Sequence, residues 1–337
     1  MKTVIRNLRK QSGMSLVELM ISLLIGSILM VGAVSIFLKS KDTYRLNETM
    51  GRIQENARLA LTMLGPDMRL ASFWGRGSDA GVVFGGAGVA DAVPAGLAIA
   101  GSCQQNWAID INLAIEGTNN NFPYAGCIPF GNGAQAGSDV VVSRHASSIS
   151  QAVATAGRVQ VFSTRTAGLL FADGIAPVTP PGSTSRIADL VSHAYYVSQD
   201  SGPGPAPFGS GVGLPSLRRK ALVPGPLVQD EEVSPGIQDL QVQFGVDTNV
   251  VGSPLRGSVN RWVNPGDPII DPLLAGFNPN AKIVAVQVWL LVRADRPEPG
   301  FINTRNYVYA DQNVTFNDNF RRLLVSETYQ LRNTWVN

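Results

Sequence analysis

Histidine and cysteine are scarce in this 337-residue chain, which has two of each. Neither His145 nor His193 has a cysteine or a second histidine at metal-ligand spacing. A Ser–His–Asp site built on Asp139 and His145 lacks the Gly-x-Ser-x-Gly turn that presents such a serine. Residues 85–88 are glycine-rich, but no lysine follows them and no strand–helix unit surrounds them, so they are not a phosphate loop. The sequence therefore predicts that the protein is not an enzyme and that it holds no metal or cofactor.

Charged residues make up only 15% of the chain, and the formal net charge is +2. The first thirteen residues hold four of the 27 basic residues and none of the 25 acidic ones, so the remainder carries a net charge of about −2. The short run Arg218-Arg219-Lys220 is predicted to be a solvated strand face. Because no extended basic surface remains, the chain is not expected to bind nucleic acid.

Long apolar runs are also scarce, and the sequence contains a single one. Residues 14–38 include one charged residue, Glu18. As a helix this run would span about 37 Å, more than the roughly 30 Å hydrocarbon core of a bilayer. The basic residues before it place the N-terminus in the cytoplasm and the residues after Leu38 outside. The sequence therefore predicts a single-pass membrane protein.

Two simpler explanations of this segment fit its details less well. A secretory signal has a shorter apolar run with its cut site after the run, whereas Gly13 precedes the run here. A plain uncleaved anchor has no use for Glu18, because a carboxylate inside a membrane costs roughly 2.5–3.5 kcal/mol and usually has a partner.

The segment Gln11-Ser12-Gly13-Met14-Ser15-Leu16-Val17-Glu18-Leu19 resembles the prepilin signature of type IV pilins and type II secretion pseudopilins. The resemblance implies that a prepilin peptidase cuts after Gly13 at the cytoplasmic face and methylates the new N-terminus at Met14, where the family usually has Phe. Glu18 matches the family's acid at the fifth mature position. A carboxylate there can pair with the Met14 amine, on its own helix or on a neighbour's, within the low-dielectric membrane. We therefore expect Glu18 to set the stagger between subunits.

Apolar residues recur every three or four positions from residue 40 to about residue 73, which predicts an amphipathic helix. Gly65-Pro66 is expected to kink or interrupt this helix, because proline cannot donate to the preceding turn. The apolar stripe comprises Leu46, Met50, Ile53, Ala57, Leu61, Leu64 and Met68. The predicted organisation is a cleaved leader at 1–13, a transmembrane helix half at 14–38, an amphipathic periplasmic half at 39–74 and a globular β-rich domain at 75–337.

Short strands and long loops are predicted after residue 74, since the chain has 35 glycines and 21 prolines. Segments 201–215 and 247–279 are predicted to be long loops. Because helices do not alternate with the strands, the fold class is α+β, with the long N-terminal helix packed on a mainly antiparallel sheet. The predicted strands cover 107–115, 138–144, 158–163, 193–198, 217–223, 237–246, 282–293, 307–310 and 322–326.

Three later segments, 236–247, 286–293 and 329–333, resemble the PilW minor pilins. The turn at 247–251 has too few acids for a calcium loop. The resemblance implies that other minor pilins and the major pilin are partners through the N-terminal helix, together with the prepilin peptidase, the inner membrane and a tip adhesin. It also implies an inner-membrane location with a periplasmic domain before assembly, and a place in the pilus, at its tip, afterwards.

Cys103 and Cys127 would both lie in the oxidising periplasm, where disulfides persist. A disulfide between them closes a loop of about 25 residues, worth roughly 3 kcal/mol by chain entropy. A metal pair or a redox motif would need other spacing or more ligands. A disulfide is therefore the predicted state.

The expected function is that of a minor pilin in a complex that primes pilus assembly and sits at the tip. One alternative is a J-type pseudopilin of type II secretion, although such relatives are usually shorter. Another is a tip adhesin that binds a surface ligand through exposed aromatics such as Trp262 or Tyr309, for which burial in the core is the more usual role.

Overall fold

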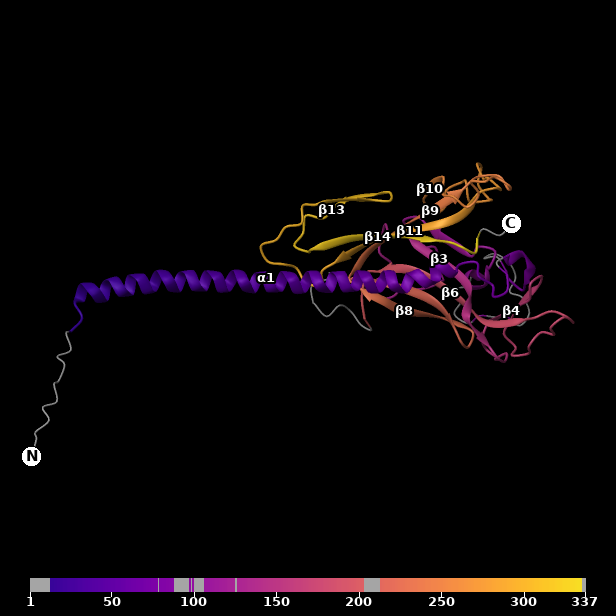
Figure 1. Cartoon of the computed structure of the whole chain (residues 1–337), viewed down its shortest axis with the longest axis horizontal. Coiled ribbons are helices and arrows are strands. Elements are labelled where there is room, and N and C mark those ends of the chain that lie inside the picture. Colours follow the sequence, from indigo (N-terminus) through magenta and orange to yellow (C-terminus); the bar gives the residue numbers. More distant parts are fainter. Residues whose placement is uncertain are drawn as a thin grey trace, which may run out of the picture. The chain divides into compact units, whose positions relative to one another are not determined.

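The computed structural model describes residues 13–77, 79–87, 97, 99, 106–124, 126–202 and 213–334. The chain divides into two compact units, Met1–Gly51 and Arg52–Asn337. Helix α1 (Leu16–Leu70) contributes to both units, whereas every strand in the described part of the chain belongs to the second (Figure 1). This arrangement confirms the predicted α+β class.

The part of α1 in the first unit is apolar and exposed. An 18-residue window within α1 has a mean hydropathy of 2.5, so the helix is long and apolar enough to cross a membrane. Large side chains along it are uncovered, including Leu16 at 75% exposure and Met30 at 69%. Such a surface must be covered by lipid or by other apolar helices.

The part of α1 in the second unit, from Arg52 onward, buries one face. Its buried apolar residues recur every three or four positions, as the stripe predicted. They are Ile53, Ala57, Ala60, Leu64 and Met68.

The predicted interruption of α1 at Gly65-Pro66 is wrong, because the helix continues to Leu70. Strand side chains bind this part of the helix. Ser143 donates to the Asp67 carbonyl at 2.7 Å, and Tyr329 donates to the Leu61 carbonyl at 3.0 Å.

The larger sheet has eight strands in the order β1-β5-β4-β6-β3-β2, with β7 paired to β6 and β8 paired to β7. Its longest strand, β6, pairs with β4 through its first residues and with β7 through its last. The described pairs are antiparallel except β1 with β5. The strands are β1 (Val83–Phe84), β2 (Ile115–Thr118), β3 (Val140–Gln151), β4 (Gln160–Ser163), β5 (Gly168–Phe171), β6 (Arg186–Ser198), β7 (Ser216–Val223) and β8 (Leu227–Pro235).

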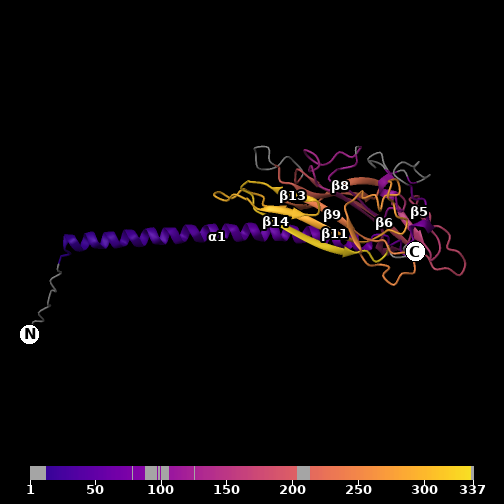
Figure 2. The ribbon, with the colours of Figure 1, turned by 90° about the horizontal axis from the view of Figure 1, so that it is seen from above.

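The smaller sheet has four antiparallel strands in the order β10-β9-β11-β14, and β12 and β13 form a separate hairpin (Figures 1 and 2). The predicted strand at 237–246 is confirmed, but it is not buried on one face alone, since Gln241 and Gly245 are buried as well as Leu240, Val242 and Phe244. Figure 1 shows β11 and β14 on one side of the second part of α1 and β8 on the other. The strands are β9 (Ile237–Asp247), β10 (Arg261–Val263), β11 (Lys282–Arg293), β12 (Asn306–Tyr309), β13 (Gln312–Thr315) and β14 (Arg322–Gln330).

The predicted strand at 107–115 is wrong. Residues Asn106–Ile109 form the short helix η2 (a second one, η1, covers Ala80–Val82), and β2 begins only at Ile115. The fully buried Arg144 explains this local structure, because its guanidinium donates to the carbonyls of Trp107 and Leu113 and pairs with Glu116 at 2.5 Å. The predicted loop at 247–279 also contains a strand, β10.

The basic run Arg218-Arg219-Lys220 on β7 lies opposite an acidic run on β8, a strand that the sequence patterns missed. Lys220 pairs with Asp230 at 2.6 Å, and Arg219 pairs with Glu231 at 2.8 Å. Because Arg218 and Lys220 are only 5% and 6% exposed, the predicted solvated strand face is wrong at these two positions. Opposite charges directly across two strands instead stabilise the register.

Candidate assembly and anchoring sites

The predicted processing site lies at the start of α1. Gly13 and Met14 are exposed and precede the helix. Glu18 is exposed on the first turn, and its carbonyl accepts from Ser22 at 2.7 Å. Gln11 and Ser12 lie outside the described residues. The roles of Gly13, Met14 and Glu18 remain predictions.

The two histidines, which are distant in sequence from each other, meet at one buried carboxylate. Asp67, near the end of α1, is 8% exposed. Its Oδ2 lies 2.5 Å from His193 Nδ1 on β6, and its Oδ1 lies 3.5 Å from His145 Nε2 on β3. The Tyr195 hydroxyl donates to the same Oδ2 at 2.5 Å. We call Asp67, His145, His193 and Tyr195 the helix anchor.

The electrostatics of the helix anchor favour an ionised Asp67. Burial alone would raise the pKa of Asp67, but hydrogen bonds from His145, His193 and Tyr195, and the charge of His193, lower that pKa well below its ordinary value. Burial and the neighbouring carboxylate raise the pKa of Tyr195, so its hydroxyl remains a donor. The contacts of Tyr195, His193 and the more distant His145 with one buried carboxylate hold the end of α1 against β3 and β6.

The helix anchor has no nucleophile available for catalysis. The nearby Ser143 hydroxyl donates to the backbone carbonyl of Asp67. His145 Nδ1 lies 2.9 Å from the Ala146 carbonyl, which occupies its second nitrogen. The sequence analysis missed the helix anchor because Asp67 lies 78 residues from His145 and 126 residues from His193. The one local signal was an acid placed on the apolar side of the amphipathic stripe, between Leu64 and Met68.

The predicted disulfide involves one described residue. Cys127 is 6% exposed and packs in a core cluster with Trp107, Tyr124 and Val140. Cys103 lies outside the described residues, so the pairing remains a prediction.

The turn after β9 satisfies its acid without a metal. The Asp247 carboxylate accepts the Gly257 N–H at 2.6 Å and the Asn249 N–H at 2.8 Å, and it lies 3.7 Å from the Arg256 guanidinium. Within the described ranges, no group of three or more His, Cys, Asp or Glu side chains is arranged to hold a metal ion.

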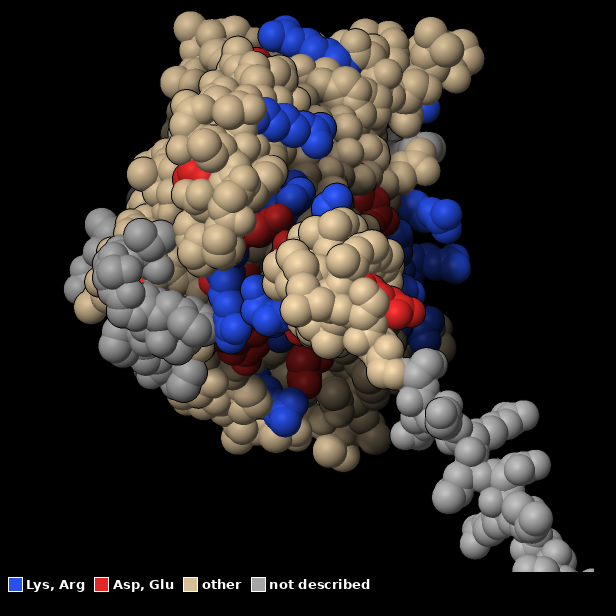
Figure 3. Space-filling view, turned by 90° about the vertical axis from the view of Figure 1, so that its left-hand side faces the viewer, with Lys and Arg blue, Asp and Glu red and all other residues tan. Residues whose placement is uncertain are grey.

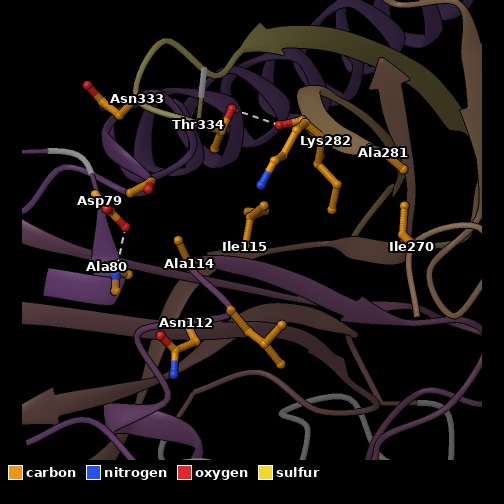
Figure 4. Close-up of a pocket in the computed structure, with 14 residues that line it drawn as sticks. Asp79, Ala80, Asn112, Ala114, Ile115, Ile270, Ala281, Lys282, Asn333 and Thr334 are labelled. Carbon is orange, nitrogen blue, oxygen red and sulfur yellow. Dashed lines mark hydrogen bonds between the residues drawn. The ribbon is translucent and has the colours of Figure 1, made fainter. Parts of the chain in front are cut away.

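A cavity of about 300 Å³ lies between the start of β11, the turn before β2 and the segment after β14 (Figure 4). Its polar lining includes Asp79, Lys282 and Thr334. Thr334 donates to the Ile283 carbonyl at 2.7 Å, and Asp79 accepts the Gly81 N–H at 2.8 Å.

The two aromatic residues considered for surface binding, Tyr309 and Trp262, differ in solvent exposure. Tyr309 is 4% exposed and its hydroxyl donates to Asp239 at 2.6 Å, which confirms a core role. Trp262 is 39% exposed, so the expectation of burial is wrong for this residue. Figure 3 shows basic and acidic side chains close together on a face that is mostly uncharged.

Comparison with known proteins identifies two regions of the chain. Residues 8–34 match the prokaryotic N-terminal methylation motif, and residues 194–333 match the type IV pilus-assembly protein W family, PilW. The second match begins within β6 and includes the whole four-stranded sheet and the β12–β13 hairpin. No curated protein and no solved structure matches the chain.

The methylation motif, the single apolar N-terminal helix and the antiparallel domain together define a pilin-like protein with a role in pilus assembly. These features fit a pilin that is anchored in the inner membrane and later incorporated in the pilus. Within this class the chain resembles the type IV minor pilins of the PilW family, as its sequence predicted. Such proteins are structural and assembly proteins rather than enzymes, and their family implies contacts with other pilins and with the prepilin peptidase.

Proposed function

We propose that this protein is a minor pilin that joins other minor pilins in a complex that primes pilus assembly, at or near the pilus tip. The observation that carries the proposal is the size of the second unit, Arg52–Asn337, relative to the single helix that anchors it. A fibre shaft repeats one subunit at short intervals, and so large a domain with long loops would clash there. A position at the end of the fibre avoids the clash.

The N-terminal segment and the helix anchor have complementary roles in this proposal. Cleavage after Gly13 frees an amine at Met14, and Glu18 pairs with such an amine in the membrane, which sets the axial position of the helix. The helix anchor then holds the end of α1 to the sheets through Asp67.

A deletion strain tests the proposal through its surface pili. Pili are counted by electron microscopy in the deletion strain and again in a background that cannot retract pili, with secreted-enzyme activity measured alongside. We expect pili to be lost, to return when retraction is blocked, and secretion to stay intact. Normal pili with failed secretion would instead assign the protein to a type II secretion pseudopilus.

A further inference from the structure

The four-stranded sheet β10-β9-β11-β14 has two different faces. One face packs on α1, where the Tyr329 hydroxyl reaches the Leu61 carbonyl. Side chains alternate along a strand, so Thr328 and Gln330, on either side of Tyr329, point to the opposite face. We call this opposite face the outer face; the strands that form it are seen from above in Figure 2.

The β12–β13 hairpin covers one end of the outer face. Tyr307 and Tyr309 of β12 form a buried cluster with Leu291 of β11, and Trp289 and Leu324 pack against it. The cover is therefore apolar and close to Trp289. Away from the hairpin the outer face is open along β14, where Thr328 and Gln330 are exposed; Gln243 and Gln287 are half-buried, and Ala285 is only 4% exposed.

The open part of the outer face presents uncharged polar side chains in a row across the strands. Gln287 of β11 lies opposite Gln243 of β9 on one side and Thr328 of β14 on the other. Asn264, which follows β10, continues the row, because its Oδ1 accepts from Gln243 Nε2 at 2.9 Å. Adjacent strands are about 4.8 Å apart, so neighbouring amide or hydroxyl groups in this row are separated by about that distance. This spacing is roughly the length of one sugar ring.

An indole lies on each side of this row. Trp262 of β10 lies opposite Gly245 of β9. A Cβ on Gly245 would come within 3.0 Å of the Trp262 ring, so the glycine leaves room for the indole to lie against the sheet. The second indole is that of Trp289, which is half-buried beside the hairpin and lies opposite Ser326 of β14.

The row continues into a cluster of amides around one carboxylate. Asp311, in the β12–β13 turn, accepts from Asn264 at 3.1 Å, from Asn119 at 2.9 Å and from Asn120 at 3.0 Å. Gln312 in turn donates to Asn120 Oδ1 at 2.6 Å. These contacts hold the amides in place from three separate parts of the chain.

We propose that the outer face binds a neutral oligosaccharide. Amide and hydroxyl side chains such as Gln287 and Thr328 can donate and accept hydrogen bonds, which suits sugar hydroxyls, and an indole offers an apolar face for the C–H side of a sugar ring. The rows formed by Gln243, Gln287, Thr328 and their neighbours Ala285 and Gln330 carry no charged side chain. Nucleic acid would need basic residues, and a transmembrane helix of another subunit would need an apolar groove. The proposal concerns a ligand of the assembled protein and does not depend on a role in priming.

Binding is tested with the full-length mature protein in a detergent that has no sugar headgroup, because a glycoside detergent would compete. Cellohexaose, chitohexaose and maltohexaose are titrated while tryptophan fluorescence is recorded. The variants are Trp262→Ala and Gln287→Ala, and the control is Val178→Ser, which changes a 90% exposed residue between β5 and β6. Pilus counts and urea unfolding of each variant show whether assembly or folding has changed.

We expect at least one probe to bind with a Kd at or below the millimolar range, and each outer-face variant to weaken it by about tenfold or more, with the control unchanged. The proposal is overturned if none of the three sugars binds, or if both outer-face variants bind as the wild type does. A purified neighbouring pilin that binds the wild type but not Trp262→Ala, with no sugar bound, would also overturn it. If the outer-face variants form normal numbers of pili, the proposed priming role stands whether or not the sugars bind.

Discussion

Replacing Asp67 by alanine removes the acceptor at the centre of the helix anchor. The Tyr195 hydroxyl and His193 Nδ1 each lose a 2.5 Å contact while remaining largely buried. A hydrogen bond to a charged group contributes about 1.5–3 kcal/mol, and breaking a buried charged pair costs about 3–5 kcal/mol. Because the contacts share one carboxylate they do not add fully, so we expect Asp67→Ala to lower the free energy of unfolding by about 3–5 kcal/mol.

The loss can be measured by urea unfolding of the full-length protein in detergent micelles. Trp74 and Trp107 are both fully buried, so tryptophan fluorescence reports unfolding of the second unit. Asp42→Ala is the matched control, since it makes the same change on the same helix at an exposed position, and it should shift the free energy by no more than about 0.5 kcal/mol. A double mutant with Tyr195→Phe should show a coupling energy of about 1 kcal/mol or more.

The stabilisation by Asp67 should also depend on pH. The pKa of Asp67 is lowered in the folded state by its hydrogen bonds, despite burial. The contribution is therefore fully present above the ordinary aspartate pKa of about 4 and is lost as the pH falls below it. Wild type and Asp67→Ala should converge in stability at acidic pH. An Asp67→Ala protein as stable as Asp42→Ala at neutral pH would refute the anchoring role.

Three further predictions concern other sites. Burial, with the charges of Asp311 and Asp239, raises the pKa of Asp139 to about 7 despite two backbone hydrogen bonds. The folded state thus keeps a proton that the unfolded chain releases above about pH 4, so the wild type loses stability as the pH rises from 4 to 7. Asp139→Asn should gain stability relative to the wild type over this range, as measured by urea unfolding. If Cys103 and Cys127 are paired, the intact mass under non-reducing conditions should be lower than after reduction by two hydrogen atoms, and Cys127→Ser should lose roughly 3 kcal/mol of stability; an unchanged mass would exclude the pairing. Glu18→Ala should reduce co-purification with other pilins. The control Glu48→Ala, at an exposed position on the same helix, should not. Normal co-assembly of the Glu18→Ala protein would show that Glu18 has no role in assembly.

The features that the sequence alone determined are those that depend on residues close together in the chain. The apolar run at 14–38, with Gly13 before it and Glu18 within it, predicted the membrane helix and the pilin class, because hydropathy and a cleavage motif are local properties. The helical stripe through Ile53 predicted which face of the helix is buried for the same reason.

The tertiary structure decided what depends on residues far apart in the chain. Asp67 meets His145 and His193 because β3 and β6 are neighbours in the sheet, and no local spacing encodes that pairing. The helix continues through Pro66, although intrinsic propensity favours a break, in a stretch whose buried face includes Leu64 and Met68. The exposure of Trp262 depends on the pairing of β10 with β9. This pairing places Trp262 opposite Gly245 and fixes the face of the sheet on which its indole lies, where it stays partly exposed. Local patterns therefore determine which segments form helix or strand, whereas the contacts between segments determine which polar groups are buried together and which surface is left to bind a partner.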